Sequence, residues 1–251
     1  MNTITPSETK LLASPAGTGS KQPKLVFIVG GYAADYVRLF AEYGKNKPGS
    51  TVYRGTKDIS KADIVVFTGG ADVDPQLYNE IQLSKTFIDP SRDKLDLEAW
   101  GLAPETAIKV GICRGAQFLN VMCGGSLWQD VDGHRQGHTI VDRMTGNRLF
   151  ATSTHHQMMR VGKGARIIAV ANQSQHKVCQ GRDWTRVGSA GHISNVAFLD
   201  GDVIDPEVVA YDSQHVLCFQ PHPEHHDAGP ALKTYFFNQL HIMELRKNNA
   251  A

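Results

Sequence analysis

A cysteine between two glycines carries the most reactive chemistry in this sequence. Residues 107–112 form an apolar stretch that predicts a buried strand, residues 116–122 predict a helix, and Cys113 lies between them. Gly111 and Gly115 flank it as in the Gly-x-Ser-x-Gly nucleophile elbow, with sulfur in place of oxygen. Such a turn needs small neighbours, because a Cβ there would collide with adjacent backbone. The helix dipole favours the reactive thiolate; a buried core cysteine is the alternative that this segment alone leaves open.

A second segment supplies a base and a carboxylate. Residues 215–219 read as a short apolar strand, and the sequence QPHPE follows it. Pro223 favours an extended conformation for His222, in which residues two apart project to the same side. Glu224 can then keep one ring nitrogen of His222 protonated and leave the other to act as a base. By themselves the two would read as solvated loop residues; with Cys113 they complete a covalent acyl-transfer site.

These residues together resemble the class I glutamine amidotransferase-like superfamily, whose triad is Cys, His and Glu in this chain order. Four further segments resemble its γ-glutamyl hydrolase branch, which cleaves γ-glutamyl amides such as γ-glutamyl-GABA. They are TGGADVDP at 68–75 with Tyr78, an acidic helix with Arg92, Asp93, Asp96 and Glu98, GGSL at 124–127 with Gln129, and STHHQ at 153–157. The likeness runs from about Lys24 to about Leu240.

The resemblance implies a role for each matched residue. Cys113 is the nucleophile, His222 the base and Glu224 its orienting carboxylate. An oxyanion hole takes one backbone N–H from Arg114, the residue after the nucleophile, and a second from Gly70 or Ala71. Substrate contacts are implied for Gln117, His156 and Gln157, and a structural hydrogen bond for His155. We expect no cofactor and no metal.

The expected activity is hydrolysis of the γ-glutamyl amide bond of glutamine or of a γ-glutamyl amine. A thioester on Cys113 is the intermediate, and glutamate and ammonia or an amine are the products. Pro221 stands where the family usually has a large aromatic residue, so we expect a different pocket wall and a different leaving-group preference.

Three alternatives remain open. A glutaminase subunit would feed ammonia to a separate synthetase or amidoligase, since nothing in the sequence resembles an attached synthetase domain. An inactive binding module on the same fold is disfavoured because all three triad residues are present. Metal catalysis lacks an accompanying pattern of acidic ligands. Its candidate ligands are His222, His225, His226, His155 and His156.

Composition fits a soluble enzyme. A chain of 251 residues can form one large α/β domain. A formal charge of +1, from 26 basic and 25 acidic residues, gives no electrostatic reason to expect nucleic acid or an anionic membrane as partner. No stretch approaches the roughly 20 apolar residues that span a bilayer. The four cysteines lack CxxC spacing. We expect a cytoplasmic protein with a small-molecule γ-glutamyl substrate, and a homo-oligomer is compatible with the sequence.

The order of elements predicts a doubly wound, mostly parallel sheet flanked by helices. Expected strands are residues 24–29, 51–54, 63–68, 107–112 and 215–219, and expected helices are 33–43, 93–101 and 116–122. After residue 130 the same domain becomes rich in short strands, at 165–171, 187–189, 196–199 and 208–211. We expect a flexible tail at 1–22, one catalytic domain at 23–245 and a C-terminal tail at 246–251. Reactive groups in such sheets collect at the carboxyl ends of strands.

Overall fold

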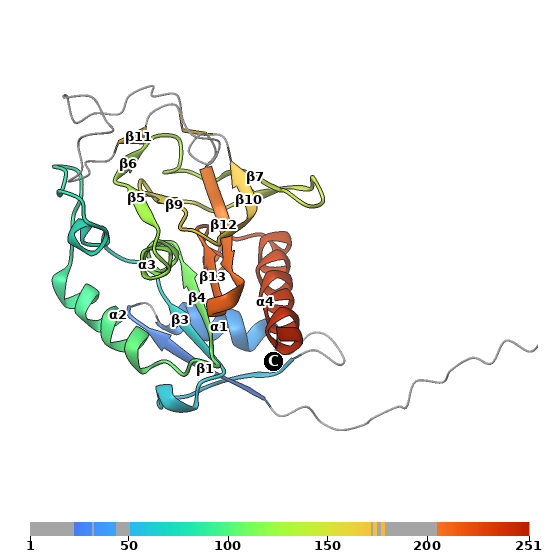
Figure 1. The fold of residues 1–251 in the computed structure, drawn as a ribbon. Coiled ribbons are helices and arrows are strands. Elements are labelled where there is room, and N and C mark those ends of the chain that lie inside the picture. The colour runs from blue at the N-terminus through green and yellow to red at the C-terminus, as the bar shows by residue number, and fades with distance from the viewer. Residues whose placement is uncertain are drawn as a thin grey trace, which may run out of the picture.

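A nine-stranded sheet is the centre of this computed structural model, which describes residues 23–31, 33–43, 51–171, 173–174, 177–178 and 205–250. The strand order is β2-β1-β3-β4-β13-β12-β10-β7-β8 (Figure 1). The parallel half consists of β2 (Tyr53–Gly55), β1 (Lys24–Val29), β3 (Ile64–Phe67), β4 (Ile108–Ile112) and β13 (Val216–Phe219).

An antiparallel half continues the same sheet beyond β13. Its strands are β12 (Asp205–Tyr211), β10 (Arg166–Ala171), β7 (His138–Asp142) and β8 (Arg148–Ala151). Two small antiparallel pairs lie outside the main sheet. They join β5 (Ser126–Trp128) to β9 (Met158–Arg160) and β6 (Asp130–Val131) to β11 (Lys177–Val178).

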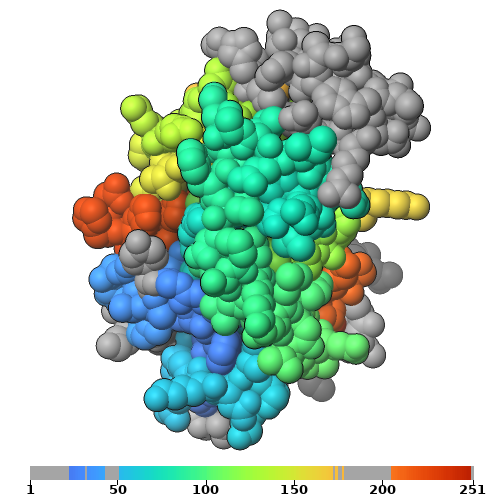
Figure 2. All heavy atoms as spheres, turned by 90° about the vertical axis from the view of Figure 1, so that its left-hand side faces the viewer, coloured from blue at the N-terminus to red at the C-terminus, as the bar shows by residue number. Residues whose placement is uncertain are grey.

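Helices cover both faces of the parallel half. Alternate residues of β3 show the two layers: Ile64 and Val66 belong to the core cluster that includes α1 (Ala33–Tyr43) and α4 (Pro230–Ala250). Val65 and Phe67 belong to the second cluster, with α2 (Pro90–Leu102) and α3 (Arg114–Met122). Figure 2 shows the face on which α2 runs down the centre. Because both faces of β3 are buried, its sequence is a continuous apolar run.

Among the described residues, three short 3-10 helices connect these elements: η1 (Ile59–Lys61), η2 (Pro75–Tyr78) and η4 (Asp212–Gln214). In the part of the chain that the structure describes, no helix combines the length and apolar character needed to cross a membrane.

The predicted doubly wound α/β architecture is confirmed. Helix α2 begins at Pro90 rather than at 93, because the Asp89 side chain accepts hydrogen bonds from the backbone of Ser91 and Arg92 and so caps the helix. The strands expected at 187–189 and 196–199, and the tail at 1–22, lie outside the described residues.

The expected C-terminal tail needs correction. Helix α4 was not predicted, and it continues to Ala250, so residues 246–250 are helical. Lys247 donates to the carbonyl of Thr106, in the loop before β4, and Arg246 lies 3.5 Å from Asp212. These contacts hold the last turn against the body of the protein, and they join residues too distant in sequence for a local pattern to reveal.

Candidate active site

Three neighbouring strands end at the same edge of the sheet. In the order β3-β4-β13, Phe67 pairs with Gly111 and Ile112 pairs with Phe219. The residues that follow these strands therefore meet. A Cβ placed on Gly69 would lie 3.3 Å from His222 Cε1 and 3.8 Å from Cys113 Cβ. The site thus forms at the carboxyl ends of the parallel strands, where reactive groups of such sheets collect.

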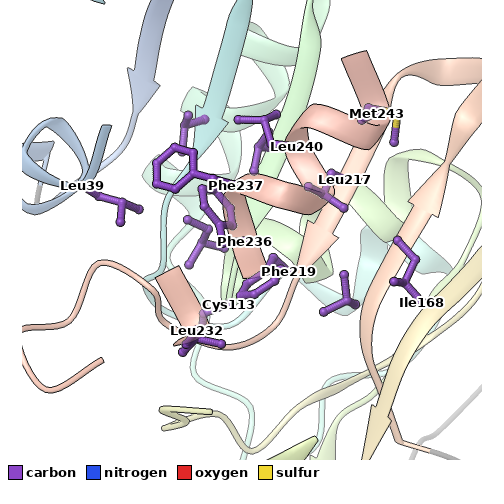
Figure 3. Close-up of a cluster of buried hydrophobic side chains, with 14 of the residues drawn as sticks. Leu39, Cys113, Ile168, Leu217, Phe219, Leu232, Phe236, Phe237, Leu240 and Met243 are labelled. Atoms are coloured by element: carbon purple, nitrogen blue, oxygen red, sulfur yellow. The ribbon is translucent and has the colours of Figure 1, made fainter. Parts of the chain in front are cut away.

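The turn that carries Cys113 has the geometry of a nucleophile elbow. Cys113 has φ 53° and ψ −113°, a conformation that non-glycine residues rarely adopt, and α3 begins at the next residue. A Cβ on Gly111 would overlap the backbone of Gly115, and one on Gly115 would overlap the carbonyl of Phe67. The predicted need for small neighbours is confirmed. Figure 3 shows Cys113 at one end of the apolar cluster that α4 covers.

Cys113 differs from the other described cysteines. All three are buried and unpaired: Cys113, Cys123 and Cys218. Burial raises the pKa of Cys123 to about 12 and raises that of Cys218 as well. Cys113 instead precedes the first turn of α3, where unsatisfied N–H groups and the helix dipole favour negative charge. Cys179 lies outside the described residues.

His222 is held between a carboxylate and the thiol. Its Nδ1 lies 2.7 Å from Glu224 Oε1, which leaves Nε2 for proton transfer. Burial opposes the charged form of His222, but the charge of Cys113, a hydrogen bond to its sulfur and the contact with Glu224 outweigh burial and raise the pKa of His222 to about 10. The structure therefore brings the three predicted triad residues together, with His222 between Glu224 and Cys113.

The backbone of His222 is anchored by a neighbouring segment. Its amide donates to the carbonyl of Thr152 at 3.1 Å, and its carbonyl accepts from the Thr152 hydroxyl at 2.6 Å. The Thr154 hydroxyl lies 3.1 Å from His222 Nε2, the ring nitrogen that Glu224 does not contact. The ring of His225 stacks on that of His222 at 4.2 Å between centroids. These contacts fix the imidazole, and most of them come from the segment before β9.

The predicted oxyanion-hole residues lie around the same turn. A Cβ on Gly70 would come within 3.4 Å of Arg114 Cδ, so the loop after β3 packs against the residue after the nucleophile. Among the described residues, the backbone N–H groups of Gly70, Ala71 and Arg114 have no hydrogen-bond acceptor. These donors remain available for a developing oxyanion.

A network of buried charged side chains connects α2 to the turn that carries Cys113 and to the loop after β3. Arg114 forms ion pairs with Asp93 and Asp96 of α2, and Asp96 also lies 3.0 Å from Arg92 Nε. Arg92 then donates to the carbonyls of Thr68 and Gly69 at 2.8 and 2.9 Å. The acidic helix therefore ties the residue after the nucleophile to the loop after β3. Glu98, expected with this helix, faces solvent beside Lys94.

The residues expected to contact substrate differ in accessibility. Gln117 is buried and donates to the carbonyl of Gln157 at 3.0 Å, and Gln157 is itself fully buried. His156 is half-buried, with Nε2 3.1 Å from Asp72 and Nδ1 3.5 Å from Asp130. The bond to Asp72 raises the pKa of His156. His156 therefore presents charge to its surroundings, whereas the two glutamines brace the segment.

A cavity of about 460 Å³ is lined by Asp130, which lies beside His156, but not by His156 itself or by Cys113, His222 or Glu224. Asp130 belongs both to its lining and to the surroundings of His156. Charges of both signs border it, from Lys85 and Arg135 and from Asp130 and Asp132. Pro221, expected in the pocket wall, is buried.

Sequence reasoning missed Tyr36, Thr154 and Asp72. The Tyr36 hydroxyl accepts a hydrogen bond from the Gly69 amide at 3.0 Å, and burial together with the charge of Glu224 raises its pKa. Nothing in the spacing of α1 distinguishes Tyr36 from a core aromatic. Asp72 and Thr154 lie inside the matched segments at 68–75 and 153–157, so those segments carried the only usable signal.

Comparison with known proteins places these features in context. A family model described as Peptidase C26 matches residues 52–224. The glutamine amidotransferase-like protein YvdE of Lactococcus lactis subsp. lactis is 31% identical over 173 residues, which cover 66% of this chain and 67% of YvdE. Rv2859c of Mycobacterium tuberculosis, provisionally named a glutamine amidotransferase, is 32% identical over 165 residues, 64% of this chain and 50% of Rv2859c. The match thus spans half to two thirds of these relatives.

Solved structures share the fold at low identity. A Thermoplasma acidophilum chain provisionally assigned to GMP synthase has a TM-score of 0.54 and 14% identity, covering 91% of this chain and 98% of that one. The structure of PurLQS from Thermotoga maritima has a TM-score of 0.50 and 14% identity, covering 87% of this chain and 97% of that one. At such identities the likeness concerns the fold alone.

Proposed function

The chain belongs to the Peptidase C26 family and is glutamine amidotransferase-like, and from this membership and the site we propose that it hydrolyses the γ-glutamyl amide bond of glutamine or of a γ-glutamyl amine. One observation carries the proposal. A strained turn before α3 holds Cys113 against His222, whose other ring nitrogen is 2.7 Å from Glu224. A nucleophile, its base and an orienting carboxylate are the parts of covalent acyl transfer.

In the first half of the reaction, the Cys113 thiolate attacks the γ-carbonyl carbon and forms a carbon–sulfur bond. The carbonyl oxygen becomes an oxyanion, which the N–H groups of Arg114 and of Gly70 or Ala71 are free to stabilise. The carbon–nitrogen bond then breaks as His222, protonated by virtue of its raised pKa, gives its proton to the leaving nitrogen. Glutamyl thioester and free ammonia or amine result.

In the second half, neutral His222 accepts a proton from a water molecule, whose oxygen attacks the thioester carbon. Collapse of this second tetrahedral intermediate releases glutamate and returns the thiolate of Cys113. Glu224 stabilises the imidazolium in both halves and keeps its Nδ1 proton in place. The site then holds the same thiolate and imidazolium as at the start.

We further propose an amine larger than ammonia as the leaving group, lying toward the cavity that Asp130 lines. Lys85 and Asp130 of its border pair with each other, and with Arg135 and Asp132 they give a polar lining compatible with a short chain that carries an amino or carboxyl group. His156, with its raised pKa, adds a positive charge where Asp130 joins the cavity. A γ-glutamyl amine with such a chain is therefore the preferred substrate class, and glutamine the smaller alternative.

The test is glutamate release by the purified protein from glutamine, γ-glutamyl-GABA and a γ-glutamyl polyamine. We expect turnover of at least one amide, its loss in Cys113→Ala and its retention in Cys123→Ala, the matched control at the other end of α3. Mass spectrometry should find the glutamyl group on Cys113 when turnover is quenched. Folded protein that releases no glutamate from any amide, or release that survives Cys113→Ala, would contradict the proposal. Release from glutamine alone would instead favour a glutaminase that serves a separate synthetase.

A further inference from the structure

A second group of histidines lies in the antiparallel half, apart from Cys113. The histidine cluster, defined as His134, His138, His155 and Glu207, comes from the loop before β7, from β7, from the segment before β9 and from β12. All four side chains are buried, and Glu207 has no exposed surface. The rings of His134 and His155 lie 4.8 Å apart and those of His134 and His138 4.6 Å apart. The proposed reaction uses none of these groups.

Each histidine of the cluster has one ring nitrogen occupied on its outer side. His138 Nδ1 lies 3.1 Å from the carbonyl of Gln136, and His155 Nδ1 lies 2.9 Å from that of Gln157. A carbonyl only accepts, so both of these nitrogens carry the proton. His134 Nε2 lies 3.0 Å from Asp205 Oδ2, which also accepts from the backbone amides of residues 173 and 174. All three rings therefore donate outward.

The inner nitrogens all face one carboxylate. His134 Nδ1 and His138 Nε2 lie 3.0 and 2.9 Å from Glu207 Oε1, and His155 Nε2 lies 3.8 Å from Glu207 Oε2. Among the described residues, His134 Nδ1, His155 Nε2 and Glu207 Oε2 are buried without a hydrogen-bond partner. Single ligand atoms of His134, His138 and Glu207 lie within 4.8 Å of one another. Several lone pairs thus converge on a common point.

The balance of charge in the cluster indicates what kind of ligand fits between the inner ring nitrogens and Glu207. With their outer nitrogens protonated, three neutral imidazoles would aim lone pairs at an ionised carboxylate, which is repulsive. Protonating the inner nitrogen of His134 alone would leave the inner lone pairs of His138 and His155 directed at the same carboxylate. Protonating all three would bury three imidazoliums around one glutamate, at a large desolvation cost. One divalent cation lets every imidazole stay neutral and gives every inner lone pair a partner. An outer hydrogen bond from each ring is also the arrangement that orients metal-ligating histidines.

We propose that the histidine cluster binds one divalent transition-metal ion of the zinc type, as a site for structure rather than for catalysis. Imidazole nitrogens and carboxylate oxygens are both zinc ligands, and structural zinc sites are four-coordinate. His134, His138 and Glu207 bring three ligand atoms together, and His155, whose Nε2 lies 3.8 Å from Glu207 Oε2, would be the fourth. The ion would join β7 and β12 to the segment before β9, which carries Thr154 beside His222 and Gln157 beside Gln117. It would thereby brace the segment that positions the base.

Another group, His222, Glu224 and His225, also brings potential ligand atoms together. It is the weaker candidate. Both ring nitrogens of His222 already have partners, in Glu224 and in Thr154 and Cys113. His225 stacks face to face on His222 and stays 3.9 Å from the same Glu224 oxygen. The experiment separates the two locations.

Purified protein, stripped with a chelator, is titrated with zinc and separately with cobalt, and retained metal is measured after gel filtration. We expect one ion per chain, a tetrahedral cobalt absorption spectrum and a higher melting temperature with zinc. His138→Ala and Glu207→Gln should lose all three responses. His241→Ala, which removes an exposed histidine of α4, should keep them.

Anomalous diffraction from zinc-soaked crystals of the parent protein locates the ion without relying on variants that fail to fold. A peak between His134, His138 and Glu207 supports the proposal. No uptake of zinc or cobalt by the parent overturns it, and so does a peak at His222 and His225 alone. Retention of the ion by both folded variants overturns it as well. Glutamate release does not enter these readouts, so the metal site and the proposed reaction can fail separately.

Discussion

The parallel and antiparallel halves of the sheet each hold buried histidine against buried glutamate. In the parallel half, His222 and Glu224 follow β13, and the imidazole nitrogen that does not contact Glu224 lies 3.1 Å from the Thr154 hydroxyl, with Cys113 nearby. In the antiparallel half, His155 faces Glu207 at 3.8 Å, and its other nitrogen is held by a backbone carbonyl.

The two histidines differ in pKa in opposite directions. The pKa of His222 rises to about 10 because negative charges outweigh the effect of burial. The pKa of His155 falls because the effect of burial exceeds that of the neighbouring Glu207 carboxylate. In the proposed reaction, the His222–Glu224 pair transfers protons because a nucleophile and the carboxyl ends of the strands adjoin it. In the proposed metal site, His155 and Glu207 are enclosed by other histidines and serve structure.

The largest expected effect comes from replacing Cys113, and the buried cysteines Cys123 and Cys218 provide the comparison. Cys113→Ala should lower glutamate release by at least about 10³-fold, because no other group forms the thioester. A diazo-ketone analogue of glutamine should label Cys113 and spare Cys123 and Cys218, whose burial raises the pKa of their thiols. Peptide mapping by mass spectrometry checks this. Even labelling of the cysteines would show that no thiol is specially activated.

The second largest expected effect distinguishes His222 from His155. His222→Ala should reduce kcat by at least about 10²-fold, since it removes both the partner of the thiolate and the acid for the leaving amine. His155→Ala should affect the thermal midpoint more than kcat. Steady-state kinetics and thermal unfolding of both variants measure the two responses. Equal, mild losses of kcat would mean that the wrong histidine has been chosen as base.

The turn that makes the parallel half reactive can be tested through its glycines. Gly115→Ala should destabilise the protein by about 3 kcal/mol or more, because the added Cβ overlaps the carbonyl of Phe67. Gly101→Ala, in α2 with open space around it, should instead stabilise by about 1 kcal/mol. Urea unfolding gives both values. A Gly115→Ala protein as stable as its parent would refute the close packing of the turn.

Replacing Glu224 and replacing Glu207 should have different effects on the pH dependence of kcat/KM. Glu224→Gln should lower kcat by about 10-fold to 10²-fold. It also removes a charge that raises the pKa of His222, so the alkaline limb of kcat/KM, near pH 10 in the parent, should move to lower pH. Glu207→Gln should leave that limb in place and lower stability instead. pH–rate profiles of kcat/KM for both variants test these expectations. An alkaline limb that does not move in Glu224→Gln would contradict the role of Glu224 in the triad.

The smallest expected effect belongs to Tyr36, which positions the loop after β3. Tyr36→Phe leaves the Gly69 amide without its acceptor, a loss of about 1 kcal/mol or roughly fivefold in kcat. Because the hydroxyl contacts Gly69 and Glu224, which we take to position the site rather than to bind substrate, KM should change little. If KM rises while kcat holds, Tyr36 contacts substrate rather than positioning the loop.

Much of the architecture follows from local sequence. Continuous apolar runs such as residues 64–67 predicted strands covered on both faces, and the structure buries them on both. The Gly-x-Cys-x-Gly spacing predicted the strained turn, and PHPE predicted a glutamate within reach of its histidine. These predictions succeeded because each interaction spans only a few residues, where backbone sterics decide the outcome.

Tertiary structure decided the rest. Tyr36 reaches Gly69 across 33 positions, and the acidic residues of α2 meet Arg114 only because two strands place α2 and α3 on one face. The histidine cluster draws on β7, β12 and two loops, and His138 meets Glu207 across 69 positions. Local propensities cannot predict such long-range contacts, because the order of strands in a sheet depends on the whole chain. The sequence alone determined which residues could react, and the sheet determined which of them lie together.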